Sequence, residues 1–357
     1  MNIVLMKGDG IGHEIFRVVE AVLNKLIFAF DADIDYEFLE VGLTRYKQFG
    51  QTIPEDFINL VSSFDGAALG PLSTLNYPKD AINLSSMLRN KMTLYSNIRP
   101  IRTFPGISKL PDMDYIIVRE NTEGFFADRS MYAGSGEFMP NSDMAFSVRK
   151  ITKSACKRII NKGFELALER KSHVTLVHKS NTLKLSDGLF LEVGRAIASN
   201  FPSVTMDTML IDACAAKLIS NPSFFDIIVT TNLFGDILSD EAAALMGSLG
   251  MAPSLNCNDN FALAQSVHGS APDITGKNIA NPTAILSSLA MLLNWYAMKN
   301  NNIALNKIAK ILDYSITQTI TSHLIRTPDI KGKNTIDDYI KTIDMILSQQ
   351  LVTSETT

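Results

Sequence analysis

The feature of this sequence that most restricts its fold is a regular alternation between short apolar runs and longer segments with helical periodicity. The short runs are typical of buried strands, and the longer segments repeat their apolar residues every three or four positions, as amphipathic helices do. This alternation favours an α/β fold in which much of the sheet is parallel. Strands are predicted over residues 3–6, 34–40, 66–69, 115–118, 174–178, 204–211, 227–231 and 263–267. Helices are predicted over residues 12–27, 55–63, 153–168, 187–199, 236–246, 282–297, 304–323 and 336–347.

Length and composition limit the class of protein. A chain of 357 residues predicts about two domains, and a hydrophobic fraction of 46% is enough for sizeable cores. A net charge of −4 argues against nucleic acid or an anionic membrane as a partner. Cys156, Cys214 and Cys257 lack metal-binding spacing, so we expect reduced thiols. No signal peptide is evident, and the most apolar long stretch, residues 284–298, is too short and polar to span a bilayer; we expect a soluble cytoplasmic protein.

Two segments rich in glycine break the simple pattern. The stretch "KGDGIGHE" (residues 7–14) follows a predicted strand, but the dinucleotide fingerprint requires Gly where His13 stands, so a Rossmann motif is not present. On the residues alone it is a tight strand-to-helix turn. The segment of residues 129–147, which includes "RSMYAGSGEFMPNSD", has too few apolar residues for a helix and is predicted as a hairpin or projecting arm.

Acidic residues in two stretches could bind a metal ion. In "TTNLFGDILSDEAA" (residues 230–243), Asp236 and Asp240 are four positions apart and share one helical face, where two hard oxygens suit Mg²⁺ or Mn²⁺. Alternatively, Asp236 serves the helix dipole in a first turn and Asp240 is merely solvated. In "LIDACAAKL" (residues 210–218), Asp212 ends a strand and begins a helix, and it could equally be an N-cap.

Basic residues beside apolar runs suggest acid-base chemistry and anion binding. Lys179, in "VTLVHKSNTLK", ends a predicted buried strand, where loss of hydration would favour its neutral form as a base; an ordinary loop lysine is the alternative. Arg89, Arg99 and Arg119 each lie beside an apolar stretch, and guanidinium forks suit a polycarboxylate ligand. Ion pairs with acids such as Glu120 or Glu123 would explain the arginines equally well.

A loop of special composition follows the last predicted strand. In "VHGSAPDITGKNIANPTA" (residues 267–284), Asp273 could accept hydrogen bonds from a ribose diol and would repel a 2′-phosphate. The Asn281-Pro282 pair predicts the start of a long helix. On chemistry alone this is a loop and no more.

Together, "GDGIGHE", "RENTEG", "TTNLFGDILSDEAA", "HGSAPDITGKNIANPTA" and "RTPDIKGKNTIDDYI" closely resemble the isocitrate/3-isopropylmalate dehydrogenase family. These metal-dependent β-decarboxylating dehydrogenases include enzymes for homoisocitrate, tartrate and D-malate, and the resemblance covers nearly the whole chain. It implies two α/β domains with a large twisted sheet that is not a Rossmann fold. Residues 1–104 plus 247–357 would form a large cofactor-binding domain. Residues 105–246 would form a small dimerisation domain with an arm at about residues 129–147.

The resemblance also implies roles for individual residues in a homodimer with shared active sites. The first glycine loop would lie near the nicotinamide, and Asp273 stands where NAD-specific members carry Asp, which implies NAD. Substrate would be bound by Arg89, Arg99, Arg119, Asn83, Ser85 and Asn181, with Lys179 as the base. Mg²⁺ or Mn²⁺ would be bound by Asp236 and Asp240 of one subunit and by Asp212 of its partner. NAD would be bound by Ile11, His268, Gly269, Ser270, Ala271, Asp273 and Asn281.

The chain departs from the family pattern at three places. Phe126 stands where the family carries a tyrosine that helps protonate the enolate carbon, and general acid catalysis is worth about 10²–10⁴-fold. Tyr132 is a candidate replacement. Gln265-Ser266 stand where many members carry Glu-Pro, so we expect an atypical adenine pocket. Ser85 and Ser86 stand where isopropylmalate dehydrogenases carry leucines, which favours an acid with a small or polar substituent.

We therefore predict an enzyme that uses NAD and Mg²⁺ or Mn²⁺. It would oxidise, with or without decarboxylation, a small di- or tricarboxylic 2-hydroxy acid of the (2R)-malate type such as isocitrate. The alternative, which Phe126 supports, is a catalytically impaired family member that acts as a ligand-binding or regulatory protein.

Overall fold

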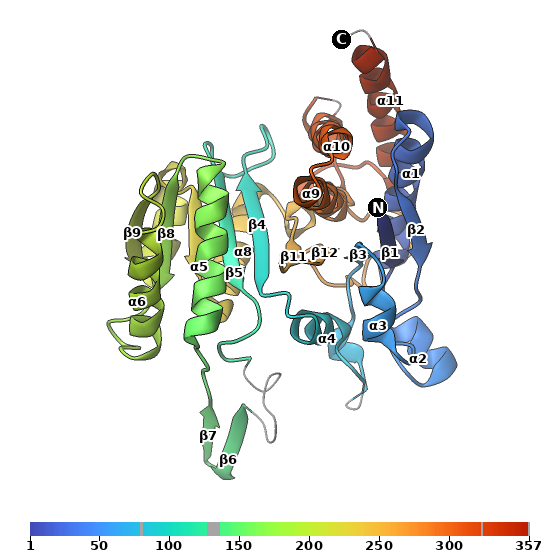
Figure 1. Ribbon diagram of the computed structural model, residues 1–357. Helices are drawn as coiled ribbons and strands as arrows, with labels where there is room; N and C mark the ends of the chain where they lie inside the picture. The colour runs from blue at the N-terminus through green and yellow to red at the C-terminus, as the bar shows by residue number, and fades with distance from the viewer. Residues whose placement is uncertain (79–80, 127–135, 323, 356–357) are drawn as a thin grey trace.

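The computed structural model describes residues 1–78, 81–126, 136–322 and 324–355, and Figure 1 shows its arrangement. A ten-stranded sheet has the strand order β2-β1-β3-β12-β11-β4-β5-β10-β8-β9. Its strands are β1 (Asn2–Met6), β2 (Asp35–Phe38), β3 (Gly66–Leu69), β4 (Ser96–Arg102), β5 (Asp114–Glu120), β8 (His173–His178), β9 (Thr205–Leu210), β10 (Ile227–Thr230), β11 (Leu255–Cys257) and β12 (Ala262–Gln265). The helices are α1 (Gly12–Phe30), α2 (Leu43–Phe49), α3 (Phe57–Ser62), α4 (Leu84–Lys91), α5 (Lys153–Leu168), α6 (Ser186–Ala198), α7 (Ile211–Ser220), α8 (Asn232–Met246), α9 (Thr283–Lys299), α10 (Ile303–Thr321) and α11 (Ile336–Glu355).

The sheet consists of two parallel blocks joined by antiparallel strands. Strands β2, β1, β3 and β12 pair in parallel, and so do β5, β10, β8 and β9. Between them, β11 is antiparallel to both β12 and β4, and β4 is antiparallel to β5. We call β11 and β4 the seam. This mixed order confirms an α/β fold that is not Rossmann.

Helices cover both faces of each block, because residues that are neighbours along a buried strand face opposite sides of the sheet. In the second block, Val118 and Val229 pack with α5 and α6, whereas Ile117 and Ile228 pack with α7 and α8. In the first block, α1, α9, α10 and α11 share one apolar cluster, and α3 and α4 pack on the other face. The larger cluster includes residues of both blocks, so the two lobes seen in Figure 1 share apolar packing across the seam.

A hairpin projects from the body below α5 in Figure 1. Its strands, β6 (Glu137–Asn141) and β7 (Met144–Ser147), pair antiparallel, and every residue in them is exposed. The rings of Phe138 and Phe146 stack with centroids 5.2 Å apart. A hairpin is thus present within the segment for which the sequence predicts one; residues 129–135, which include Tyr132, lie outside the described residues.

Several predictions about local structure are wrong. Helix α8 begins at Asn232 rather than Asp236, so Asp236 is not in a first turn and does not serve the helix dipole there. Asp212 lies in the first turn of α7, whose N-cap is Leu210, so it is not an N-cap. The long helix predicted at the Asn281-Pro282 pair is present: α9 begins at Thr283, and Asn281 Oδ1 accepts a hydrogen bond from Thr283 N. The sequence does not predict α2, α4, β4 or β11, and it indicates α7 only through the helical run that begins at Asp212.

None of the helices in the described ranges is both long enough and apolar enough to cross a membrane.

Candidate functional site

A cavity of about 290 Å³ lies where α4, α8 and the strands β4, β5 and β12 meet. We call it the acid cavity. Many of the residues that the sequence singles out line it: Asn83, Ser85, Arg89, Arg99, Arg119, Phe126, Asp236, His268 and Gly269. Three arginines that are scattered along the sequence therefore come together, as a polycarboxylate ligand would require.

Arg99 is held by a buried polar network within the seam. The residue is in the middle of β4 and only 5% exposed. Its Nε donates to Asn97 Oδ1 at 2.6 Å, and Asn97 Nδ2 in turn donates to Ser254 Oγ and Asn256 Oδ1 at 2.8 and 2.6 Å. Ser239 of α8 accepts from Arg99 Nη1. A buried guanidinium is tolerated because these acceptors replace its hydration.

Arg119 is held by the first turn of α8. It is the last residue but one of β5, is 4% exposed, and donates from Nε and Nη2 to Asn232 Oδ1 at 2.9 and 2.7 Å. Asn232 is itself fixed because its Nδ2 donates to the carbonyl of Glu123 at 3.0 Å. Asn232 is thus a positioning residue. Asn232 lies in the stretch of residues 230–243, in which the sequence pattern singles out Asp236 and Asp240 but not Asn232.

Two carboxylates on α8 face the two buried guanidinium groups. Asp236 pairs with Arg119 and also with Arg99, where the Nη2 to Oδ1 distance is 3.5 Å; Asp240 Oδ1 lies 3.3 Å from Arg99 Nη1. Burial and then the neighbouring Arg99 charge lower the pKa of Arg119 to about 10. Burial raises the pKa of Asp240. The ion-pair partners are therefore Asp236 and Asp240 rather than Glu120 or Glu123, which accept from Thr122 and Thr152.

This four-charge cluster could exchange partners. Carboxylates of a bound acid could replace the aspartates at Arg99 and Arg119, which would release two hard oxygens one helical turn apart for a divalent cation. Within the described ranges, no three His, Cys, Asp or Glu side chains lie close enough together to hold a metal ion. A cation bound to Asp236 and Asp240 would therefore need at least one further ligand.

The α4 wall of the acid cavity is polar. Asn83 caps α4, with its Oδ1 accepting from Ser86 N at 3.1 Å. Gln265, the last residue of β12, accepts through Oε1 from Ser85 Oγ at 3.1 Å and from Arg89 Nη2 at 3.3 Å. The atypical adenine pocket expected from the Gln265-Ser266 pair stays a prediction, and Gln265 contacts two residues that are predicted to bind substrate.

Phe126 lines the acid cavity, where the resemblance places a tyrosine in related enzymes. No tyrosine of the described residues lines this cavity. A phenyl ring has no proton to donate, so the cavity as described lacks the phenol that the family pattern supplies.

Lys179 and Asp212 meet away from the acid cavity. Lys179 follows β8, Asp212 follows β9, and Lys179 Nζ lies 2.5 Å from Asp212 Oδ1. This contact lowers the pKa of Asp212. Neither residue lines the acid cavity, and neither does the exposed Asn181. One chain therefore does not bring these predicted site residues to the arginines.

The loop that follows β12 packs on the first glycine loop. Ile11 N donates to the carbonyl of Ser270 at 3.0 Å, and a Cβ on Gly10 would lie 2.1 Å from that oxygen, which explains the glycine. Ser73 Oγ donates to Ser270 Oγ at 2.7 Å. The first loop is held in turn by Asp9, whose carboxylate accepts from Tyr77 Oη at 2.8 Å. The two loops thus form one rigid unit at the edge of the acid cavity.

Parts of this unit remain open to a ligand. A Cβ on Gly269 would meet nothing within 4 Å, and Asp273 is exposed. His268 Nε2 is buried and has no hydrogen-bond partner within the described part of the chain. Asn281 differs, because its amide already donates to Asp329 Oδ2 at 3.0 Å. Ala271, with a φ of 40°, shapes the turn.

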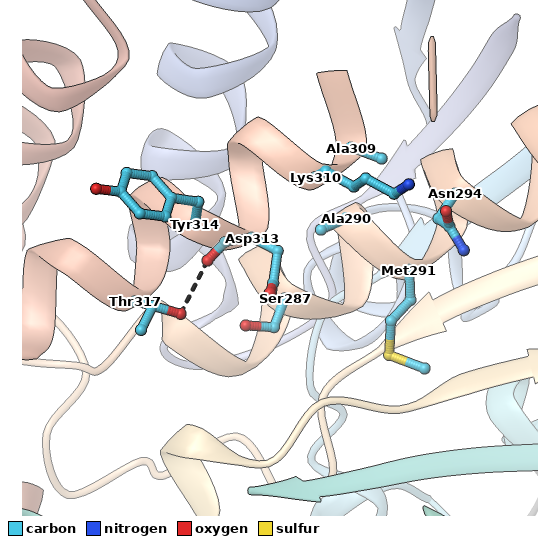
Figure 2. A pocket seen from close by; sticks show the side chains of 9 residues that line it. All are labelled: Ser287, Ala290, Met291, Asn294, Ala309, Lys310, Asp313, Tyr314 and Thr317. Atoms are coloured by element: carbon cyan, nitrogen blue, oxygen red, sulfur yellow. Dashed lines mark hydrogen bonds between the residues drawn. The ribbon is translucent and has the colours of Figure 1, made fainter. Parts of the chain in front are cut away.

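A larger cavity, of about 430 Å³, lies between α9 and α10 and is shown in Figure 2. Its lining residues include Ser287, Met291 and Asp313, and none of them lines the acid cavity. Asp313 is already paired with Arg102 at 2.7 Å. The acid cavity is therefore distinguished by its chemistry rather than its size.

The protein thus has an α/β fold and a cavity in which three arginines and an aspartate come together. Residues 2–348 match the family model described as isocitrate/isopropylmalate dehydrogenase. The chain belongs to this family. It is 38% identical over 343 residues to a 3-isopropylmalate dehydrogenase of Sulfurisphaera tokodaii, covering 96% of this chain and 98% of the relative. It is 37% identical over 361 residues to a homoisocitrate dehydrogenase of Methanocaldococcus jannaschii, covering 96% of this chain and 98% of the relative.

Solved structures agree. The crystal structure of isocitrate dehydrogenase from Methylococcus capsulatus superposes with a TM-score of 0.85 at 33% identity, covering 97% of this chain and 99% of that one. These relatives are dehydrogenases named for three acids that differ in one substituent, so family membership gives the kind of enzyme and leaves the particular acid open.

Proposed function

We propose that this protein oxidises and decarboxylates a 2-hydroxy acid of the (2R)-malate type, using NAD and Mg²⁺ or Mn²⁺. The observation that carries the proposal is the pairing of the buried Arg99 and Arg119, which line the acid cavity, with Asp236 in the same cavity and with Asp240 one helical turn further along α8. A dicarboxylic acid would supply carboxylates to the two arginines, and a divalent cation would take the two aspartates. The buried arginines would fix the carboxylates, and α8 would present the aspartates to the cation.

The donor set fits a hard cation. Asp236 and Asp240 offer carboxylate oxygens on one helical face, and Asp212 of a second subunit is the proposed third ligand. When bound, the cation would act as a Lewis acid at the substrate hydroxyl and NAD would accept the hydride. Lys179 is the proposed base that takes the hydroxyl proton, and Asp212 holds its ammonium group in place.

The loop after β12 fits a dinucleotide. A cofactor could cover the open backbone at Gly269, and it could satisfy His268 Nε2, which has no partner among the residues that the structure describes. The proposed cofactor-binding residues are Ile11, His268, Gly269, Ser270, Ala271, Asp273 and Asn281. The exposed Asp273 carboxylate supports NAD over NADP because it would repel a 2′-phosphate.

We also propose a homodimer with shared active sites. The separation of Lys179, Asn181 and Asp212 from the acid cavity supports it, since a second copy could bring them to the arginines. The exposed β6–β7 hairpin supports it too, because Phe138 is 53% and Met139 62% exposed. Such apolar exposure is typical of surfaces that become covered. Deleting residues 136–147 should raise the dimer dissociation constant; an unchanged constant would reject the role of the hairpin.

A second candidate function is acid binding without efficient decarboxylation, as in a regulatory protein. The observation that favours it is Phe126, which lines the acid cavity in place of a proton donor. The arginines, the aspartates and Lys179 are all present, and this favours the enzyme.

The experiment that separates the two candidates measures NADH formation with Mn²⁺ and a panel of 2-hydroxy acids that includes isocitrate, 3-isopropylmalate and (2R)-malate. Turnover that is abolished in Asp236→Asn supports the enzyme. Binding of an acid without NADH formation supports the regulatory protein. The absence of both binding and turnover rejects the site.

A further inference from the structure

We propose that Gln265 determines which acid is accepted, by donating a hydrogen bond from Nε2 to an oxygen of the substituent on the carbon beside the hydroxylated carbon. The inference rests on the proposed function and deepens it, because it concerns the same cavity. The preferred class of substrate is an acid whose substituent carries a carboxylate or another oxygen acceptor, and not a branched alkyl group.

The place of Gln265 is fixed by its backbone. Its N–H donates to the carbonyl of Ser254 at 3.0 Å, and β12 pairs with β3 so that Gln265 is opposite Leu69. The side chain leaves the end of the strand toward α4, where Ser85 and Arg89 are one turn apart and face the same side. Gln265 is 8% exposed. It therefore forms a wall of the acid cavity that cannot easily move away.

The hydrogen-bonding neighbours of Gln265 determine where the oxygen and the nitrogen of its side-chain amide lie. A guanidinium group has only donors, so the atom that Arg89 Nη2 contacts must be the oxygen of Gln265. The hydroxyl of Ser85 donates to the same oxygen. The –NH₂ group is thereby directed away from α4. Its orientation follows from hydrogen bonding alone, although oxygen and nitrogen have nearly the same size.

The –NH₂ group is available to a ligand. Within the part of the chain that the structure describes, Gln265 Nε2 makes no hydrogen bond, and it is not one of the buried polar atoms that lack a partner. The nitrogen is therefore open to the solvent of the acid cavity, where an oxygen of a ligand could replace water as its acceptor. A branched alkyl group in the same place would leave this donor unsatisfied and would exclude the water that could satisfy it.

The neighbouring groups point to the same class of ligand. Asn83 uses its oxygen to cap α4, which leaves its –NH₂ group as a second donor on this wall. A glutamate in place of Gln265 would have nearly the same shape but no donor, so donation here depends on the amide.

The test measures binding of three acids by isothermal titration calorimetry in the presence of Mn²⁺. Isocitrate carries a carboxylated substituent, 3-isopropylmalate carries a branched alkyl group, and (2R)-malate carries neither. The wild type should bind isocitrate more tightly than 3-isopropylmalate. Gln265→Glu removes the donor and adds a negative charge. Gln265→Met removes the donor and adds no charge, so it separates the two effects and serves if the first variant does not fold.

Both variants should lower the ratio of isocitrate affinity to 3-isopropylmalate affinity by about tenfold or more, whereas (2R)-malate affinity should change by less than about threefold. The matched control is Gln51→Glu, which adds the same charge at an exposed position that does not line the cavity. It should leave all three affinities unchanged.

The possible results separate a failure of the role of Gln265 from a failure of the proposed function on which it rests. A wild type that prefers 3-isopropylmalate, or variants that bind the acids with an unchanged ratio, would overturn the role of Gln265 and leave the proposed function standing. A wild type that binds none of the three acids would overturn the proposed function, and this inference with it.

Discussion

Lys179 Nζ lies 2.5 Å from Asp212 Oδ1, and this ion pair joins the ends of the adjacent strands β8 and β9. Its members reach the same place from different local structures, one from a turn and the other from the first turn of α7. The pair does not line the acid cavity of its own chain. That separation leads to a prediction that concerns two chains at once.

We expect two inactive variants to restore each other. Lys179→Ala and Asp236→Asn should each abolish turnover alone. When the two chains are co-expressed, a heterodimer has one site with neither substitution and one with both. About half of the dimers would be of this kind, so about a quarter of wild-type activity should return. NADH formation by the purified mixture measures it. No recovery would mean that each site is built from one chain.

Asp236→Asn should weaken Mn²⁺ binding by more than about tenfold, because it removes a charged oxygen ligand with almost no change in volume. The same change reduces the charge opposite Arg119 and Arg99. Calorimetry with Mn²⁺ measures the affinity, and circular dichroism checks that the fold is kept. The matched control is Asp259→Asn, since Asp259 accepts from Tyr95 and does not line the cavity. Equal Mn²⁺ affinity in wild type and Asp236→Asn would reject this ligand.

The exposed Asp273 should make NAD⁺ the preferred cofactor by at least about tenfold in kcat/KM, because a carboxylate accepts from a ribose diol and repels a 2′-phosphate. Asp273→Asn should narrow the preference, since the amide keeps the shape and removes the repulsion. Steady-state rates with each cofactor test it. A wild type that prefers NADP⁺ would show that the assignment is wrong.

Phe126→Tyr should accelerate decarboxylation of a β-carboxylated substrate by one or more orders of magnitude, within the range of about 10²–10⁴ for a positioned general acid. The added hydroxyl would extend from a ring that already lines the acid cavity. Oxidation without loss of CO₂ should change much less, because Lys179 and the cation carry that step. NADH and CO₂ are measured separately. Equal CO₂ rates would mean that another group, or water, already protonates the product carbon.

Stability should decrease as the pH falls through about 6.5, the ordinary pKa of histidine. Loss of hydration lowers the pKa of His268, although the Gly269 carbonyl and Asp329 oppose this shift. Below the ordinary pKa the unfolded chain therefore binds a proton that the folded chain resists, and the free energy of unfolding falls with pH. Urea denaturation at pH 7.5 and 5.5 measures the difference.

The variant His268→Asn should reduce this difference, and the exposed His13→Asn is the control. His178, whose pKa burial also lowers, should account for part of what remains. A pH dependence that is identical in wild type and His268→Asn would reject the contribution of His268.

The sequence predicts the two parallel blocks well and the seam poorly, for a physical reason. Strand β4 carries Asn97, Arg99 and Pro100, so it lacks the apolar run by which buried strands are recognised. Its polar side chains are tolerated because partners on β11 and α8 satisfy them. Those partners are more than a hundred residues away in the chain, and no local pattern reveals them.

In the candidate site, too, the sequence indicates some residues and misses those whose role depends on distant contacts. The sequence indicates Arg119 and Asp236 because they lie in "RENTEG" and "TTNLFGDILSDEAA", two motifs that resemble those of the family. The role of Gln265 depends on its contact with Ser85, which is 180 positions away along the chain. The place of Asn232 depends on the exact start of α8, where prediction erred. Whether Asp212 joins Asp236 depends on a second copy of the chain, which no single sequence describes.

The position of the seam also suggests how the length of an acid would affect its binding. Arg99 lies on the seam strand β4 and Arg119 on the adjacent β5, whereas Ser85 and Gln265 belong to the block that contains β3 and β12. A molecule that contacts both groups would bridge the two blocks of the sheet, which already share apolar packing across the seam. An acid too short to reach both groups would leave one of them in contact with water. The affinity for an acid would then depend on its length, which no single contact determines.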